Sequence, residues 1–141
     1  MVDPGRVRAL LDRLAEELSH LRALAARDPS DLLADPDLLA AVKYRFVVAI
    51  ETCIDLAHHA IASEGLRAPA SFADAFAVLG EAGFVDRGLV PALQEMARFR
   101  NLLVHGYLRV DDQRVVEILR SRLDDLDAFR AQVARSALGE G

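Results

Sequence analysis

The stretch that decides the fold is PDLLAAVKYRFVVAIETCIDLAHHAIASEG, residues 36–65. Its apolar residues recur at steps of three and four, the period of one face of an α-helix. Asp35 and Pro36 are typical of a helix start, and Gly65 of a helix end. About 29 residues at 1.5 Å each predict a rod of roughly 40 Å that can form the spine of a bundle. The apolar face comprises Val42, Phe46, Ala49, Ile50, Cys53, Ala57, Ala60 and Ile61.

Helical periodicity extends over most of the remaining chain, and no segment alternates with period two for long enough to suggest a sheet. Further helix starts are indicated by Asp3-Pro4, by Ser71 with Asp74, and by Asp112. The expected helices cover about residues 4–28, 36–65, 72–83, 87–105 and 113–133, followed by a frayed tail over 138–141. We therefore expect an all-α fold, an antiparallel up-and-down bundle of four long helices plus one short connecting helix.

The 141 residues suit one domain, 1–141, with its core over about residues 3–135. The formal net charge of -5 argues against a protein that coats nucleic acid by bulk electrostatics. A single cysteine, Cys53, excludes an internal disulfide and a cysteine-built zinc site within one chain; we expect it to be a small buried residue. We see no secretory signal at the N-terminus and no uninterrupted apolar run of about 20 residues, so we expect a cytoplasmic protein without a membrane span.

The segment with the strongest chemical signal is RNLLVHGY, residues 100–107, in which arginine, asparagine, histidine and tyrosine surround a helix end. Five residues on an ideal helix rotate by about 500°, so Arg100 and His105 would lie roughly 140° apart. The helix must therefore end if the two side chains are to converge. We expect Gly106 to adopt positive φ and let His105 swing back toward Arg100.

An arginine beside a histidine suits cleavage of a phosphodiester by the 2′-hydroxyl of RNA itself. The histidine moves a proton, and the arginine holds the phosphate as negative charge builds. Such a reaction needs neither a metal ion nor a cofactor. From spacing alone, the same run also fits a helix C-cap that carries a surface histidine.

The run resembles the R-x4-H-x-Y signature of the HEPN superfamily, specifically the HepT-like (DUF86) ribonuclease toxins. The likeness covers residues 3–129 and includes segments 51–58, 65–69 and 72–79. It implies that Arg100 and His105 are catalytic and that Asn101 supports them. It also implies homodimers in which motifs from two chains line one RNA-binding cleft.

The resemblance assigns Tyr107 a regulatory role, although on spacing alone a tyrosine there is most often a half-buried packing residue. In HepT-like toxins this tyrosine accepts AMP from a partner MNT-type nucleotidyltransferase, the antitoxin, with which higher hetero-oligomers can form. Phosphates beside His105 would place negative charge and bulk in the RNA cleft. This chain lacks the Gly-Ser motif and paired aspartates of a nucleotidyltransferase, so the modifying activity must come from another protein.

Two carboxylates on the long helix, Glu51 and Asp55, are four residues apart and either position Arg100 or are simply solvated. Asp55 and His59 also share a helix face, which suits either a metal site or polar residues near the bundle surface or the dimer seam. Lys43, Arg45, Arg98 and Arg109 could form a basic rim for RNA or could be exposed helix charges.

The leading hypothesis is therefore a metal-independent endoribonuclease toxin that is neutralised through AMPylation. Two alternatives remain open on the sequence: a non-catalytic HEPN subunit that binds substrate for, or scaffolds, a nucleotidyltransferase, and a purely structural dimerisation domain.

Overall fold

The computed structural model describes residues 1–139 of the chain, and these residues form an all-helical domain, as expected from the sequence. Two short 3-10 helices, η1 (Arg87–Leu89) and η2 (Tyr107–Arg109), flank the fifth α-helix. The α-helices are α1 (Pro4–Ala25), α2 (Pro29–Ala34), α3 (Pro36–Ser63), α4 (Phe72–Glu81), α5 (Val90–His105), α6 (Asp112–Ser121) and α7 (Leu123–Leu138).

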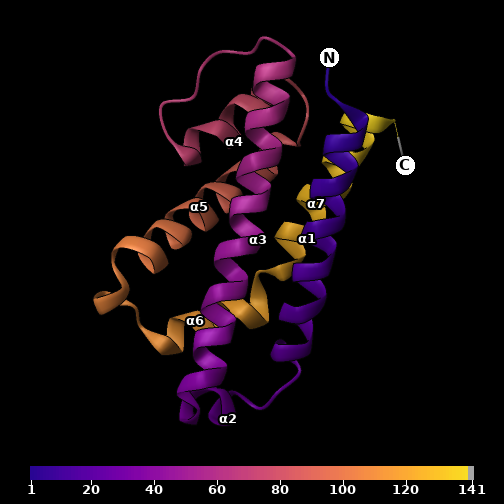
Figure 1. Cartoon of the computed structure of the whole chain (residues 1–141). Helices are drawn as coiled ribbons and strands as arrows, with labels where there is room; N and C mark the ends of the chain where they lie inside the picture. The colour runs from indigo at the N-terminus through magenta and orange to yellow at the C-terminus, as the bar shows by residue number, and fades with distance from the viewer. Residues whose placement is uncertain (140–141) are drawn as a thin grey trace.

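The 28-residue helix α3 forms the centre of the bundle, with α1 beside it along most of its length (Figure 1). α7 packs against α1, and α4 and α5 pack against each other and against α3. Aromatic side chains pack between these helices. Phe46 of α3 meets Phe99 of α5 edge to face at 5.2 Å between ring centroids, and Phe76 of α4 meets Phe129 of α7 at 5.5 Å. Each fully buried side chain of this size contributes about 1.5 to 3 kcal/mol to folding.

By length and composition α3 could also cross a membrane, and it is the one helix of the described residues 1–139 with this property. In the bundle, 56% of its most apolar stretch is buried against other helices. A central helix of a globular domain has the same length and composition. The packing of α3 therefore accounts for its apolar character.

The helix starts expected at Asp3 and Asp35 are confirmed, since each side chain accepts hydrogen bonds from two amides of the first turn. Ser71 Oγ likewise accepts a hydrogen bond from the Asp74 amide at 3.0 Å. The start of α6 is displaced by one residue: Asp111, not Asp112, is the N-cap, and its carboxylate accepts from the amide of Gln113 at 2.9 Å. These caps satisfy amides that would otherwise lack partners at the helix ends.

Two helix boundaries differ from the expectation. A second Asp-Pro pair at residues 28–29 opens the separate short helix α2, which buries Leu32 completely. The expected last helix is divided at Arg122, where φ is -117° and ψ is 0°. The break lets α6 pack on α1, α2 and α3 while α7 packs on α1, α3 and α5, which one straight rod could not do. α7 ends before Gly139; residues 140–141 of the expected frayed tail lie outside the described residues.

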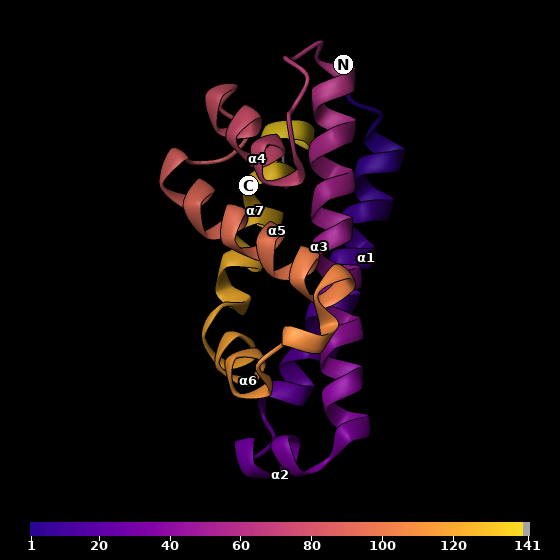
Figure 2. The same ribbon diagram turned by 90° about the vertical axis from the view of Figure 1, so that its left-hand side faces the viewer.

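The helix α5 crosses α3 obliquely instead of running parallel to it, as Figure 2 shows. Its C-terminal part approaches the middle of α3, so residues near Arg100 meet residues near Glu51. This crossing places the chemically interesting segment against the centre of the bundle.

Candidate active site at the end of α5

The Arg100 side chain is anchored to α3 by a two-donor contact with one carboxylate oxygen. Its Nη2 and Nε atoms donate to Oε2 of Glu51 at 2.7 Å and 3.1 Å. Only 14% of the Arg100 side chain is exposed, against 43% for Glu51. A guanidinium so far removed from water needs a charged partner, because an unpaired buried charge is strongly unfavourable. Glu51 therefore holds Arg100 in place, which was one of the two roles open from the sequence.

The remaining part of the Arg100 guanidinium meets a neutral amide. Nη1 donates to Oδ1 of Asn101 at 3.1 Å. Asn101 is exposed at the helix surface, so this contact lies at the edge of the solvent. An amide oxygen orients the guanidinium without adding negative charge.

An aromatic ring that the sequence analysis did not single out completes the surroundings of Arg100. The Phe72 ring lies 5.1 Å from the Arg100 guanidinium carbon, within the range of a cation–π contact. His58 of α3 packs near the same ring, with centroids 5.8 Å apart. Phe72 is the first residue of α4, so the approach of α4 to α5 creates this contact. Arg100 and Phe72 are far apart in sequence with no characteristic spacing, and no sequence signal could have identified the pair.

The loop before α4 is fixed by Arg67. Its guanidinium donates to both carboxylate oxygens of Asp74 at 2.8 Å and 3.0 Å, and to both oxygens of Glu81 at 2.9 Å and 2.7 Å. These hydrogen bonds, with one from the Ala70 amide, lower the pKa of Asp74 to about 2. They also lower the pKa of Glu81 and raise the pKa of Arg67. The cluster holds the N-terminus of α4, and with it Phe72.

Asp55, the other candidate for a partner of Arg100, has no hydrogen bond or ion pair with it. It is exposed and lines a shallow groove between α1 and α3 with Arg6 and Arg13. Glu51 borders the same groove one helical turn earlier. Glu51 and Asp55 are one helical turn apart on α3, and only Glu51 lies where it can bind Arg100 of α5.

His105 is the last residue of α5, and its side chain is exposed. Within residues 1–139, no side chain donates to or accepts from its imidazole. Because α5 is helical through His105, Arg100 and His105 lie roughly 140° apart around the helix axis. The expectation that His105 swings back toward Arg100 is therefore wrong within a single chain.

The reason for this difference lies in Gly106. Its φ is -115° and its ψ is 28°, so it does not adopt the positive φ we expected. Its amide instead donates to the Leu102 carbonyl at 2.8 Å. A Cβ at this position would lie 2.8 Å from Cδ1 of Leu102 and 3.2 Å from its carbonyl oxygen. Glycine lets the helix end pack closely here, and a larger residue would require the Leu102 side chain to move.

Tyr107 starts the 3-10 helix η2 and exposes 68% of its surface. It is therefore not the half-buried packing residue that spacing alone would suggest. Two apolar neighbours are also exposed, Val104 at 37% and Leu108 at 88%. An exposed apolar group of this kind often marks an interaction surface.

Three of the other polar candidates, His59, Lys43 and Arg45, have structural partners, whereas Arg98 and Arg109 are exposed. His59 Nε2 accepts a hydrogen bond from the Asp3 amide at 3.0 Å, which ties the start of α1 to α3. Lys43 pairs with Asp112 at 2.8 Å, and Arg45 pairs with Glu17 at 3.2 Å. In the part of the chain that the structure describes, no three histidine, cysteine, aspartate or glutamate side chains form a group that could hold a metal ion. Cys53 is buried, and burial raises the pKa of its thiol.

Comparison with known proteins identifies relatives across most of the chain. The family described as Ribonuclease HepT-like matches residues 14–133. The mRNA nuclease HepT of Shewanella oneidensis is 29% identical over 102 residues, which cover 72% of this chain and 77% of that protein.

Solved structures show the same fold at low sequence identity. YutE of Bacillus subtilis, a cytosolic protein of unknown function, superposes with a TM-score of 0.84 at 19% identity, covering 99% of this chain and 96% of YutE. The tri-AMPylated HEPN toxin of Shewanella oneidensis, solved in complex with an MNT antitoxin, gives a TM-score of 0.86 at 23% identity. That match covers 93% of this chain and 98% of the toxin. With the family match over residues 14–133, the chain belongs to the ribonuclease HepT-like family.

Proposed function

We propose that the chain is a metal-independent endoribonuclease toxin in which Arg100 binds the scissile phosphate and His105 transfers protons. The observation that carries this proposal is the contrast between the two side chains. Arg100 is fixed by Glu51, Asn101 and Phe72, whereas His105 is exposed and has no hydrogen-bonding partner in residues 1–139. A phosphate ligand must be held in place, while a general acid or base must be accessible to the substrate.

The proposed reaction uses the 2′-hydroxyl of RNA as the nucleophile. As this oxygen attacks the adjacent phosphorus, a base removes its proton and the bond to the 5′-oxygen of the next nucleotide breaks. The leaving oxygen takes up a proton, and a 2′,3′-cyclic phosphate remains. Arg100 stabilises the negative charge that builds on the phosphate oxygens.

The geometry of α5 supports a site made from two chains. Within one chain, Arg100 and His105 lie on different sides of the helix. The exposed apolar residues Val104 and Leu108 lie next to the motif and offer a surface for a second copy. We propose a homodimer in which the motif segments of both chains border one RNA cleft, with Arg100 of one chain facing His105 of the other.

We further propose that a partner MNT-type nucleotidyltransferase inactivates the site by AMPylation of Tyr107. Its exposed side chain, 68% accessible in the single chain, supports access by a modifying enzyme. The HEPN toxin of Shewanella oneidensis that shares this fold is itself AMPylated and bound to an MNT antitoxin. Nucleotide attached two residues from His105 would repel RNA by its charge and block the cleft by its bulk. Both partners of such a pair would act in the cytoplasm.

The test is an RNA-cleavage assay with purified wild type and the His105→Ala variant in EDTA, with Tyr107 confirmed unmodified by mass spectrometry. We expect wild type to cleave RNA and the variant to lose about 10² to 10⁴ in rate without loss of helicity. Equally intact RNA in both samples would favour a non-catalytic role as a subunit that binds substrate for a nucleotidyltransferase.

A mixing experiment tests the two-chain site. Arg100→Ala and His105→Ala chains, each inactive alone, are unfolded together and refolded. Random pairing would restore about a quarter of the sites if each site takes one residue from each chain of a two-fold dimer. A mixture as inactive as its components would contradict this arrangement.

A further inference from the structure

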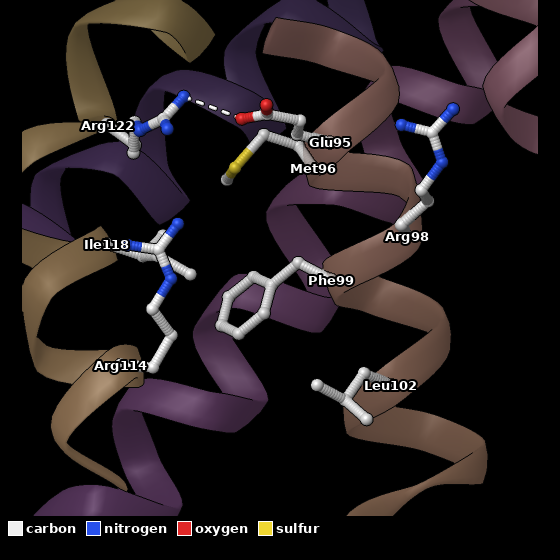
Figure 3. Close-up of a pocket in the computed structure, with 8 residues that line it drawn as sticks. All are labelled: Glu95, Met96, Arg98, Phe99, Leu102, Arg114, Ile118 and Arg122. Carbon is white, nitrogen blue, oxygen red and sulfur yellow. Dashed lines mark ion pairs between the residues drawn. The ribbon is translucent and has the colours of Figure 1, made fainter. Parts of the chain in front are cut away.

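A groove opens between α5 and α6 (Figure 3). By the period of the helix, most of its lining positions on α5 lie on the side opposite Arg100. Its floor consists of apolar side chains from both helices. The volume of about 260 Å³ is below the usual range of about 300 to 1,000 Å³ for drug-sized ligands, so the groove suits a single planar ring better than a folded cofactor. The floor residues are Met96, Phe99, Leu102 and Ile118.

The rim of this groove carries three arginines, Arg98, Arg114 and Arg122, against one glutamate, Glu95. Two further carboxylates pair with these arginines from beside the groove, Glu117 with Arg114 and Asp125 with Arg122. An apolar floor bordered by Arg114, which is held only in an exposed ion pair, fits a ligand that combines a flat ring with negative charge, because a phosphate can replace the exposed carboxylate partner.

The arginines differ in how free they are to bind a ligand. Arg122 pairs with Glu95 at 2.9 Å across the end of the groove, as Figure 3 shows. Arg114 pairs with Glu117 at 3.2 Å, but both side chains are more than half exposed. Exposed pairs of this kind contribute little and can exchange partners. Arg98 is exposed, and its guanidinium is turned away from the floor in Figure 3.

The groove lies beside the proposed catalytic histidine. Arg98, Leu102 and His105 follow one another at steps of four and three, so they share one face of α5. Leu102 precedes His105 by a rise of about 4.5 Å along the helix. A ring on this floor would therefore lie within about the length of one nucleotide from His105.

We infer that this groove binds one nucleobase of a single-stranded RNA, adjacent to the nucleotide that is cleaved. The base stacks on the floor formed by Phe99, Leu102 and Ile118. Arg114 contacts a neighbouring phosphate, while the Glu95–Arg122 pair offers an acceptor and donors to the edge of the base. The inference rests on the proposed function and adds to it a base-binding site that selects where RNA is cut.

The phosphate contact is tested with a fluorescently labelled 2′-O-methyl RNA hexanucleotide, which lacks the attacking hydroxyl and stays intact. Fluorescence anisotropy measures its affinity for the full-length protein at several salt concentrations. We expect Arg114→Ala to weaken binding about tenfold and to reduce the slope of log K against log salt by about 0.7. Arg120→Ala is the matched control, since Arg120 is an exposed arginine of the same helix outside the groove.

The base contact is tested separately. Replacing single nucleotides of the same oligonucleotide with abasic residues should weaken binding about tenfold at one position only. A 4-thiouridine at that position should crosslink under ultraviolet light to Met96, Phe99 or Leu102, mapped by tandem mass spectrometry.

Equal affinities of Arg114→Ala and Arg120→Ala, or crosslinks confined to other segments, would overturn the inference. If wild type still cleaves RNA in those samples, the proposed function survives. If Arg114→Ala loses antitoxin binding but keeps its RNA affinity, the groove is a protein-docking surface, and the inference that it binds a nucleobase is overturned. Failure of unmodified wild type to cleave any RNA would overturn the proposed function itself.

Discussion

Two arginines of this chain are both held by carboxylates, but their partners differ. Arg67, in the loop before α4, binds two carboxylates, Asp74 and Glu81, through four hydrogen bonds of 2.7 to 3.0 Å. Arg100, on α5, binds the single carboxylate of Glu51 and directs its remaining nitrogen to the neutral Asn101.

This difference separates a structural arginine from one that can bind a ligand. Two carboxylates outweigh the charge of Arg67, so a phosphate arriving there would meet net negative charge. Arg100 with Glu51 is neutral overall, and Nη1 lies at an exposed edge of the contact. An arginine carries five N–H donors, so Arg100 can keep its anchor and still donate to a phosphate. The number of acidic partners, not the presence of an arginine, therefore distinguishes the two sites.

The largest expected effect comes from removing each arginine in turn. Arg100→Ala should lower the rate of RNA cleavage about 10²- to 10³-fold, because one stabiliser of the transition-state charge is lost. Arg67→Ala should leave the rate within about threefold, since an exposed ion-pair cluster contributes mainly to local structure. Initial rates on a fluorogenic RNA measure both. Similar losses in the two variants would erase the distinction between the sites.

A smaller effect is expected from neutralising one acidic partner at each site. Glu51→Gln should lower the cleavage rate about tenfold, because the Arg100 guanidinium becomes less firmly positioned. The conservative Glu51→Asp should recover part of this loss. Glu81→Gln is the matched change at the Arg67 site and should not alter the rate. A Glu51→Gln enzyme with wild-type kinetics would show that Arg100 does not depend on this anchor.

The aromatic contact of Arg100 should contribute less than its carboxylate. Phe72→Leu keeps an apolar side chain but removes a cation–π contact of about 0.5 to 1 kcal/mol, so the rate should fall about two- to fivefold. Phe84→Leu, at a partly buried phenylalanine just after α4, controls for general loss of packing. The hypothesis fails if the two variants share the same rate and the same melting temperature.

The smallest effect concerns the stability of the Arg67 cluster. The pKa of Asp74 is lowered to about 2 in the folded protein, so the ionised carboxylate favours folding. That contribution is complete above the ordinary aspartate pKa of about 3.9 and is lost as the pH falls toward 2. Asp74→Asn should therefore lower the melting temperature at neutral pH, and the difference from wild type should close between about pH 4 and pH 2. A difference that is independent of pH would contradict the role of this charge.

The helix starts were predictable because capping is local. Asp3-Pro4, Asp35-Pro36 and Ser71 each satisfy amides within three residues, so short segments contain the whole signal. The break at Arg122 was not predictable, because the apolar stripe continues through it from α6 into α7. Only packing against several other helices required the chain to turn there.

The candidate site was predictable to the same extent. The run from Arg100 to Tyr107 is contiguous and stands out in the sequence itself. The sequence could not show whether Glu51 or Asp55 binds Arg100, because the helical period places both on one face of α3. The angle at which α5 crosses α3 selects between them. Phe72 has no sequence signal, since a cation–π contact requires no particular spacing.

The amino-acid sequence by itself determined the all-α class, the main helix starts and the candidate segment for the active site, because periodicity, capping and a contiguous motif are local properties. Only the tertiary structure decided that Glu51 and Phe72 hold Arg100, that Asp55 does not, and that His105 lies on another side of α5. These relations depend on how helices distant in sequence pack, and packing is a property of the whole folded chain.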